Sequence, residues 1–116
     1  MTKRNLYTHV KHEDGHSVAY VEVGLRLGLD VSSCITVSEE MRKVDREICF
    51  TKLSHDVHSE PSYFSANAKN NFSLLSLNAH RGNMLKISVY GIDAVAMECA
   101  EKLYSAIRHG GNTLRF

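Results

Sequence analysis

Apolar and polar residues alternate along three stretches of the chain, and this period of two predicts half-buried strands. The stretches are 18–23, 47–52 and 85–89, and in the first of them Ala19, Val21 and Val23 would share one face. A shorter run at 63–68 predicts a fourth strand, which follows a polar connection at 55–61 that contains the chain's only proline.

Apolar residues at spacings of three and four predict three helices. The first follows residue 30, the second follows Asn70 and carries Leu74 and Leu77, and the third follows Asp93 and ends at Gly110 and Gly111. Asn70 and Asp93 are typical N-cap residues. The apolar positions of the first helix are Val31, Cys34, Ile35, Val37, Met41 and Val44, and those of the third are Ala96, Cys99, Ala100, Leu103 and Ile107.

The order strand–helix–strand–strand–helix–strand–helix predicts an α+β fold. We expect an open-faced sandwich, with a four-stranded, mainly antiparallel sheet covered on one face by three helices. Residues 1–16 are polar and are interpreted as an N-terminal extension, 17–110 as the domain and 111–116 as a C-terminal tail. His9, His12 and His16 have a spacing compatible with metal binding on a helix, but without acidic or Cys partners at matching spacing a solvated tail is the simpler interpretation.

Composition narrows the class of protein. The 116 residues fit one domain, and 14 basic against 13 acidic residues argue against nucleic-acid binding through phosphate neutralisation. Apolar runs stop at four residues, such as 94–97, so neither a membrane span nor a signal peptide is predicted. Three widely spaced cysteines favour free thiols and a cytoplasmic location. The sequence has no glycine-rich phosphate loop and no paired-cysteine motif, so neither a cofactor nor a metal site is predicted.

The stretch 67–77, Asn-Ala-Lys-Asn-Asn-Phe-Ser-Leu-Leu-Ser-Leu, resembles the second-helix signature of HPr, the histidine-containing phosphocarrier of the bacterial sugar phosphotransferase system. The similarity continues through 79–83 and 91–94, and upstream through 26–29. Element order and spacing agree from about residue 17 to residue 109. The resemblance implies an HPr-like fold for most of the chain.

The family's active-site loop reads Gly-Leu-His-Ala-Arg-Pro, and its histidine accepts the phosphoryl group. Residues 28–33 match that loop, but Asp30 occupies the histidine position, Ser32 the arginine position and Ser33 the proline position. In many members a phosphorylated serine opens the second helix, and that position is Asn70 here. The resemblance therefore implies a degenerate member that lacks the residues of phosphocarrier chemistry, and we assign no catalytic residue.

Asp30 has three interpretations. Capping of the helix that follows is the simplest, because a carboxylate is stabilised at a helix N-terminus. A fixed negative charge in place of phosphohistidine is the second. Transfer through an acyl phosphate is the third, but such sites need Mg²⁺, and the nearest acidic residues, Glu39 and Glu40, are more than two helical turns away.

The resemblance also implies a protein-docking patch on the first two helices. The matching positions are Ser32, Ser33, Thr36, Val37 and Glu40 on the first helix and Asn70, Asn71, Phe72 and Leu75 on the second. Phe72 is the predicted anchor, if it lies outside the core.

We expect a non-catalytic binding or regulatory protein whose partners are other proteins, either phosphotransferase-system components or a regulator. Two alternatives stay open. One is a divergent phosphocarrier that uses Asp30, Ser32 or Ser33. The other is a structural module that self-associates, for example as a homodimer through exposed sheet edges.

Overall fold

The computed structural model describes residues 9–13, 16–54, 62–91, 93–112 and 114–116. Five strands and three helices follow one another along the chain. They are β1 (His9–Glu13), β2 (His16–Gly24), α1 (Val31–Met41), β3 (Ile48–Ser54), β4 (Ser62–Asn67), α2 (Asn71–Ser76), β5 (Met84–Tyr90) and α3 (Ala94–Ile107).

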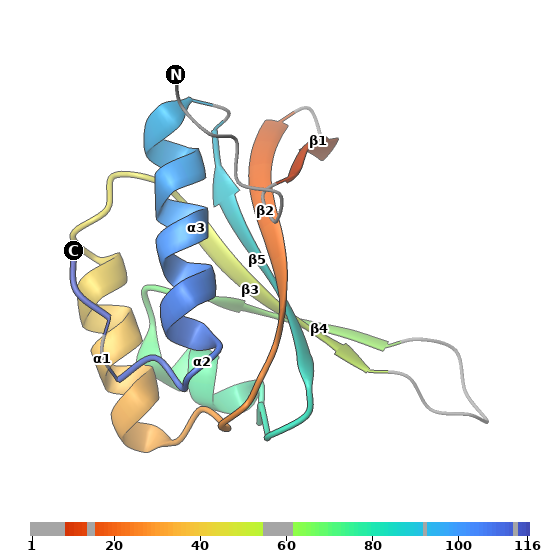
Figure 1. Ribbon diagram of the computed structural model, residues 1–116, viewed down its shortest axis with the longest axis vertical. Coiled ribbons are helices and arrows are strands. Elements are labelled where there is room, and N and C mark those ends of the chain that lie inside the picture. Colours follow the sequence, from red (N-terminus) through yellow and green to blue (C-terminus); the bar gives the residue numbers. More distant parts are fainter. Residues whose placement is uncertain (1–8, 14–15, 55–61, 92, 113) are drawn as a thin grey trace.

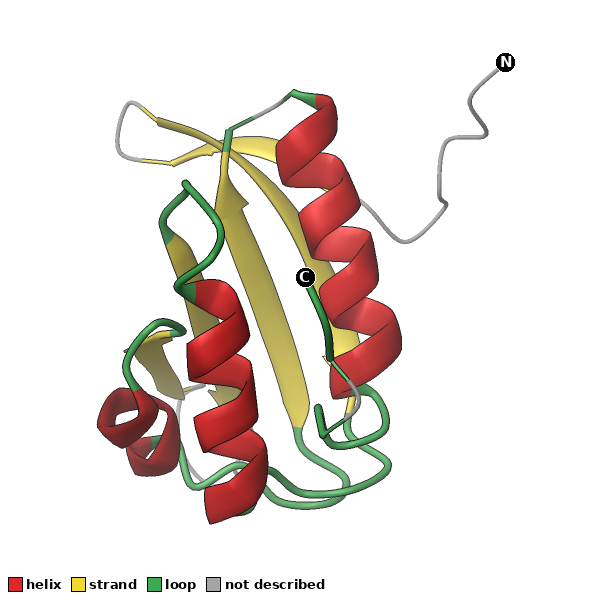
Figure 2. Cartoon of the chain, turned by 90° about the vertical axis from the view of Figure 1, so that its left-hand side faces the viewer, coloured by secondary structure: helices red, strands yellow, loops and turns green. Residues whose placement is uncertain are grey.

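The strands form one antiparallel sheet in the order β1-β2-β5-β3-β4. All three helices cover the same face of this sheet, as Figures 1 and 2 show. Helix α3 packs over β2 and β5, while α1 and α2 pack against each other. The predicted α+β open-faced sandwich is confirmed, with one strand more than the four that the sequence predicted.

The additional strand is β1, which lies in the segment interpreted as a polar extension. It pairs with β2 in a register that places Val10 opposite Ala19 and His12 opposite Ser17. The interpretation of 1–16 as a polar extension did not include this strand, because an edge strand is held by main-chain hydrogen bonds that residues of almost any type can make. The apolar pattern therefore carried no signal for it. The predicted hairpin connection at 55–61 lies outside the described residues.

The core lies between the sheet and the helices. Leu85, Ile87 and Val89 alternate along β5 and are buried, as are the predicted positions of α3. Leu114 is also buried, and the backbone N–H of Phe116 donates to Glu40 Oε1 at 2.6 Å. The last residues therefore pack against the domain, which the interpretation of 111–116 as a tail did not anticipate.

Helix α1 buries a different stripe from the one its apolar residues predicted. Cys34, Val37 and Met41 are buried, whereas Val31 is 59% exposed and Ile35 is 39% exposed. With 3.6 residues per turn, positions 31 and 35 lie at the side of the stripe formed by 34, 37, 38 and 41. Apolar composition alone does not fix which flank of a short helix faces the core.

No helix in the described part of the chain is both long enough and apolar enough to cross a membrane.

Candidate functional site

Asp30, at the position that matches the phosphorylated histidine, is the N-cap of α1. One oxygen of its carboxylate accepts a hydrogen bond from the backbone N–H of Ser33 at 2.8 Å. This hydrogen bond is the main reason that the pKa of Asp30 is lowered from its ordinary value of 3.8. The capping interpretation is confirmed, and the carboxylate is charged at neutral pH.

The two serines after Asp30 have different surroundings. Ser33 is buried, whereas Ser32, at the position of the family's arginine, is exposed in the first turn of α1. A hydroxyl cannot reproduce the two parallel hydrogen bonds that an arginine gives to a phosphate. Across the described residues, no group of three or more His, Cys, Asp or Glu side chains is arranged to hold a metal ion.

Asp30 closes the first of three loops that meet at one end of the molecule. These loops span 25–30, 77–83 and 108–112, and we call this region the loop end (Figure 2). Backbone hydrogen bonds join them: Leu29 N–H donates to the Ala79 carbonyl at 2.9 Å, and Arg26 N–H donates to the Arg108 carbonyl at 3.1 Å. Gly28 makes the first contact possible, because a Cβ there would lie 3.2 Å from the same carbonyl oxygen.

Asn70, at the position of the family's regulatory serine, is the N-cap of α2. Its side-chain oxygen accepts from the backbone N–H of Ser73 at 3.1 Å, as the sequence predicted for this residue. The hydroxyl of Ser73 in turn accepts from the backbone N–H of Asn67 at 3.0 Å. The opening of α2 is therefore held by amide and hydroxyl groups in structural roles.

Phe72 projects from the first turn of α2 and is 77% exposed, so the alternative that it packs in the core is wrong. Leu74 and Leu77 are buried, as predicted, and Leu75 is half-buried against the core. Val31 and Ile35 are exposed on α1, the helix against which α2 packs. Sequence reasoning missed these two residues, because it assigned them to the core.

The other residues of the predicted docking patch are partly accessible and partly buried. Ser32 and Asn70 are exposed, and Thr36 and Asn71 are half-buried. The side chains of Ser33, Val37 and Glu40 are buried, so they cannot contact a partner in this conformation. We define the docking surface as the residues that remain accessible, namely Val31, Ser32, Ile35, Thr36, Asn70, Asn71, Phe72 and Leu75.

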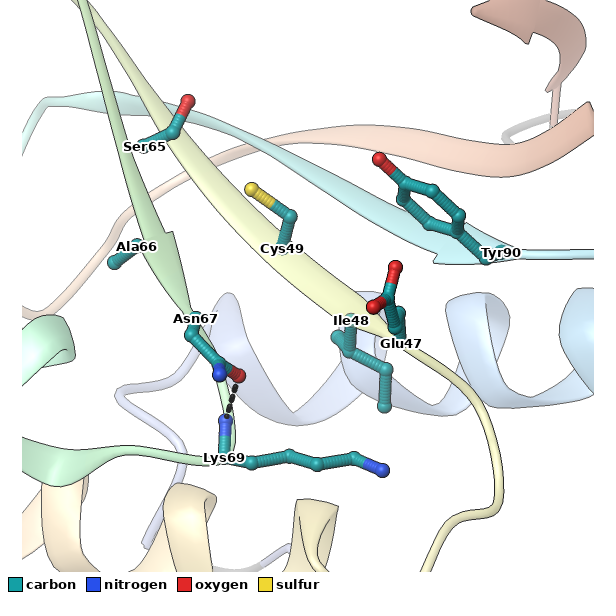
Figure 3. A pocket seen from close by; sticks show the side chains of 8 residues that line it. All are labelled: Glu47, Ile48, Cys49, Ser65, Ala66, Asn67, Lys69 and Tyr90. Carbon is teal, nitrogen blue, oxygen red and sulfur yellow. Dashed lines mark hydrogen bonds between the residues drawn. The ribbon is translucent and has the colours of Figure 1, made fainter. Parts of the chain in front are cut away.

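The three cysteines are free, and two of them are buried. Burial raises the pKa of the Cys34 thiol, and it raises the pKa of the Cys99 thiol to about 11. Cys49 is half-buried and points away from the helices (Figure 3). The expectation of free thiols is confirmed, and the two buried thiols are held in their protonated, unreactive form.

A hollow of about 300 Å³ lies where β3 begins and β4 ends (Figure 3). Its charged groups are Glu47 and Lys69, and the Lys69 ammonium already donates to the Val44 carbonyl at 2.6 Å. Asn67 accepts from the backbone N–H of Lys69 at 3.0 Å and also has a structural role. The hollow is distant in sequence from Asp30, and Asn67 and Lys69, two of its polar side chains, already make hydrogen bonds to the backbone.

Neither a protein-family profile nor a curated protein matches the sequence. Among solved structures, the chain is similar to the crystal structure of HPr-C-His from Thermoanaerobacter tengcongensis. The two share 18% sequence identity and a TM-score of 0.52, over 78% of this chain and 93% of that chain. At this identity the likeness establishes the fold.

The element order from β2 to α3 and the one-sided helical layer define an open-faced α+β sandwich. In its particulars this sandwich is the HPr-like fold.

Proposed function

We propose that this protein is an HPr-like binding or regulatory module that does not carry phosphate and that docks other proteins through α1 and α2. The observation that carries the proposal is the exposure of Phe72 on a helix packed against α1. A large aromatic side chain left in water by a well-packed domain is a typical anchor for a protein partner. Phosphotransferase-system proteins are the partner class that the HPr-like fold favours.

The state of Asp30 supports a non-catalytic role. Its carboxylate accepts the Ser33 N–H, and its lowered pKa describes an anion stabilised by the helix terminus rather than an activated nucleophile. Ser32 offers no positive charge to steady a phosphoryl group. The same two positions in the family combine a nucleophilic imidazole with a cationic clamp.

Phosphotransfer is tested directly by incubating the protein with phosphoenolpyruvate and the first enzyme of the phosphotransferase system. Intact-mass spectrometry at neutral pH would detect a phosphoryl group, and an authentic HPr serves as the positive control. We expect no mass shift. A shift that disappears in Asp30→Asn, which keeps a capping side chain, would establish the divergent phosphocarrier instead.

Docking is tested with Phe72→Ala and with Val95→Ala as the matched control. Val95 is 56% exposed on α3, so its truncation also removes an exposed apolar side chain but leaves the docking surface intact. The measurement is the affinity for phosphotransferase-system proteins, determined one at a time by calorimetry. We expect Phe72→Ala to weaken binding by at least tenfold, the effect of about 1.4 kcal/mol, and Val95→Ala to leave it unchanged. Equal affinities for the two variants would remove Phe72 from the interface.

A further inference from the structure

The loop end carries an excess of positive charge. Its three loops contain Arg26, Arg81 and Arg108, and Asp30 is the only acidic residue within them. Lys52 adds a further positive charge, since its Nζ lies 3.3 Å from the Asn78 carbonyl oxygen. For a chain with a formal net charge of +1, this is a local concentration of charge.

The arginine side chains of the loop end are not used to hold the fold. Backbone groups make the bonds between the loops, including Arg26 N–H to the Arg108 carbonyl and Gly82 N–H to the Leu25 carbonyl at 2.9 Å. Among the described residues, no ion pair or side-chain hydrogen bond involves the guanidinium groups of Arg26, Arg81 or Arg108. Three cations therefore lie in neighbouring loops, and no described residue neutralises them.

The loop end also carries an exposed apolar side chain. Leu27 is 56% exposed and lies between the loops, with its Cβ 3.4 Å from the position that a Cβ on Gly110 would take. Arg26 precedes it, and the chain at 79–81 packs against the neighbouring Gly28. An exposed leucine in a region whose loops carry three arginines fits an acidic peptide that also carries an apolar side chain, because both kinds of contact are satisfied together.

We propose that the loop end binds an acidic, leucine-bearing segment of a partner protein. The inference rests on the proposed docking role and specifies the chemistry of the partner. A protein segment fits better than nucleic acid, since the charged area is confined to three loops and a nucleic acid would extend its phosphate backbone well beyond them. It also fits better than a free phosphate ion, which would leave Leu27 without a contact.

The test uses ¹⁵N-labelled protein and a blocked peptide of sequence Glu-Glu-Leu-Glu-Glu, with the isosteric Gln-Gln-Leu-Gln-Gln as its uncharged control. We expect the acidic peptide to shift the amide signals of Arg26, Leu27, Arg81 and His109, and the control peptide to leave them in place. Affinity should fall when salt is raised from ~0.05 M to ~0.5 M, because exposed charges are screened.

Charge reversal locates the contact. Arg81→Glu should weaken binding of the acidic peptide about fivefold. Arg115→Glu is the matched control, because Arg115 is exposed outside the loop end, where its guanidinium donates to the neighbouring Leu114 carbonyl at 2.7 Å and its charge acts on Glu40. It should change the affinity less than twofold. Equal loss in both variants would mean that the peptide responds to net charge alone, and that result would overturn the proposal.

Two further titrations test whether the loop end binds a different class of ligand. A double-stranded DNA oligonucleotide that binds more tightly than the acidic peptide would overturn the proposal, and so would inorganic phosphate that displaces the peptide at equal concentration. Absence of any shift at the loop end would do the same. The peptide titration repeated with Phe72→Ala should give an unchanged affinity. The proposal for the loop end and the proposal for the docking surface can therefore fail independently of each other.

Discussion

The two ends of the sandwich use charge in opposite ways. At the end where α1 finishes and α3 begins, basic and acidic residues are paired: Arg46 forms an ion pair with Asp93, and Lys43 forms one with Glu40. Arg42 also donates from Nε to the Lys69 carbonyl at 3.0 Å. We call this region the paired end.

At the loop end, backbone hydrogen bonds hold the loops together, and the guanidinium groups of the three arginines have no hydrogen bond or ion pair in the described part of the chain. The difference shows that similar residue types can serve stability at one end of a small fold and remain available for binding at the other. Charge content by itself does not distinguish the two uses, whereas the contacts of each side chain do.

The largest effect should come from the backbone of the loop end. Gly111 has a φ of +84°, and a Cβ there would lie 2.8 Å from Val37 Cγ2. Gly111→Ala should therefore reduce the free energy of unfolding by about 3 kcal/mol, through the left-handed backbone and the overlap with a buried side chain. Urea denaturation measures the change.

The matched control for that substitution is Gly82→Ala. Gly82 also has a positive φ of +90°, but a Cβ added there would meet no atom of the described residues within 4 Å. Gly82→Ala should therefore reduce the free energy of unfolding only through its left-handed backbone, by about 1 kcal/mol. Equal losses in the two variants would show that the overlap with Val37 adds no cost to that of the left-handed backbone.

At the paired end, Asp93 should be the most sensitive charged residue. It caps α3 by accepting the Ala96 N–H at 3.1 Å, and it also pairs with Arg46. Asp93→Ala removes both contacts and should lower Tm by about 5–8 °C. Asp93→Asn keeps a capping oxygen, so its Tm should decrease less. Thermal melts of both variants therefore separate the contribution of the cap from that of the ion pair.

The same residue predicts a pH dependence. The pKa of Asp93 is lowered from its ordinary value of 3.8, chiefly because its carboxylate accepts the Ala96 N–H. A group whose pKa is lower in the folded state stabilises the fold above its unfolded pKa and loses that effect as acid protonates it. The stability of the protein should therefore decrease as the pH is lowered below about 4. The stability of Asp93→Asn should decrease less steeply over the same range. Parallel acid titrations followed by circular dichroism would contradict this if the two curves coincide.

Asp30 provides the corresponding test at the loop end. It caps α1 but forms no ion pair in the described part of the chain, so Asp30→Ala should lower Tm by about 4 °C, less than Asp93→Ala. Asp30→Asn should leave Tm almost unchanged. A loss for Asp30→Ala that matches the loss for Asp93→Ala would mean that the ion pair with Arg46 contributes nothing.

The smallest effect should come from the unpaired arginines. Arg26→Gln and Arg81→Gln remove charge without removing a contact within the described residues, so stability should stay within about 0.5 kcal/mol. Arg46→Gln at the paired end should be measurably less stable than either. Thermal melts at low salt, where surface charges act over the longest distance, give the clearest reading.

The sequence predicted the parts of the fold that depend on apolar periodicity and on caps. The α3 stripe, the caps Asn70 and Asp93 and the strands around Val21 and Ile87 followed from local rules, since each residue type has a local physical reason to occupy its position. Strand β1 could not be found in this way, because its main-chain pairing leaves no apolar alternation.

The candidate site was harder to predict than the fold. The capping role of Asp30 could be argued from position, and the exposure of Phe72 depended on which face of a six-residue helix meets the sheet. Burial of Val37 and exposure of Ile35 depended on the rotation of α1 about its axis, which tertiary packing determines. The sequence did not predict the loop end, because Arg26, Arg81 and Arg108 are far apart along the chain. Backbone hydrogen bonds between the three loops bring these positions into one region of the fold.

The position of β5 has a consequence for the order in which the chain can fold during its synthesis. This strand lies between β2 and β3 in the sheet, yet it is the last of the five to leave the ribosome. Before Met84–Tyr90 emerges, the β1–β2 and β3–β4 pairs have no strand to join them among those that the structure describes. Completion of the sheet then pairs Val18 with Tyr90, so the decisive step is the insertion of one late strand between two earlier hairpins.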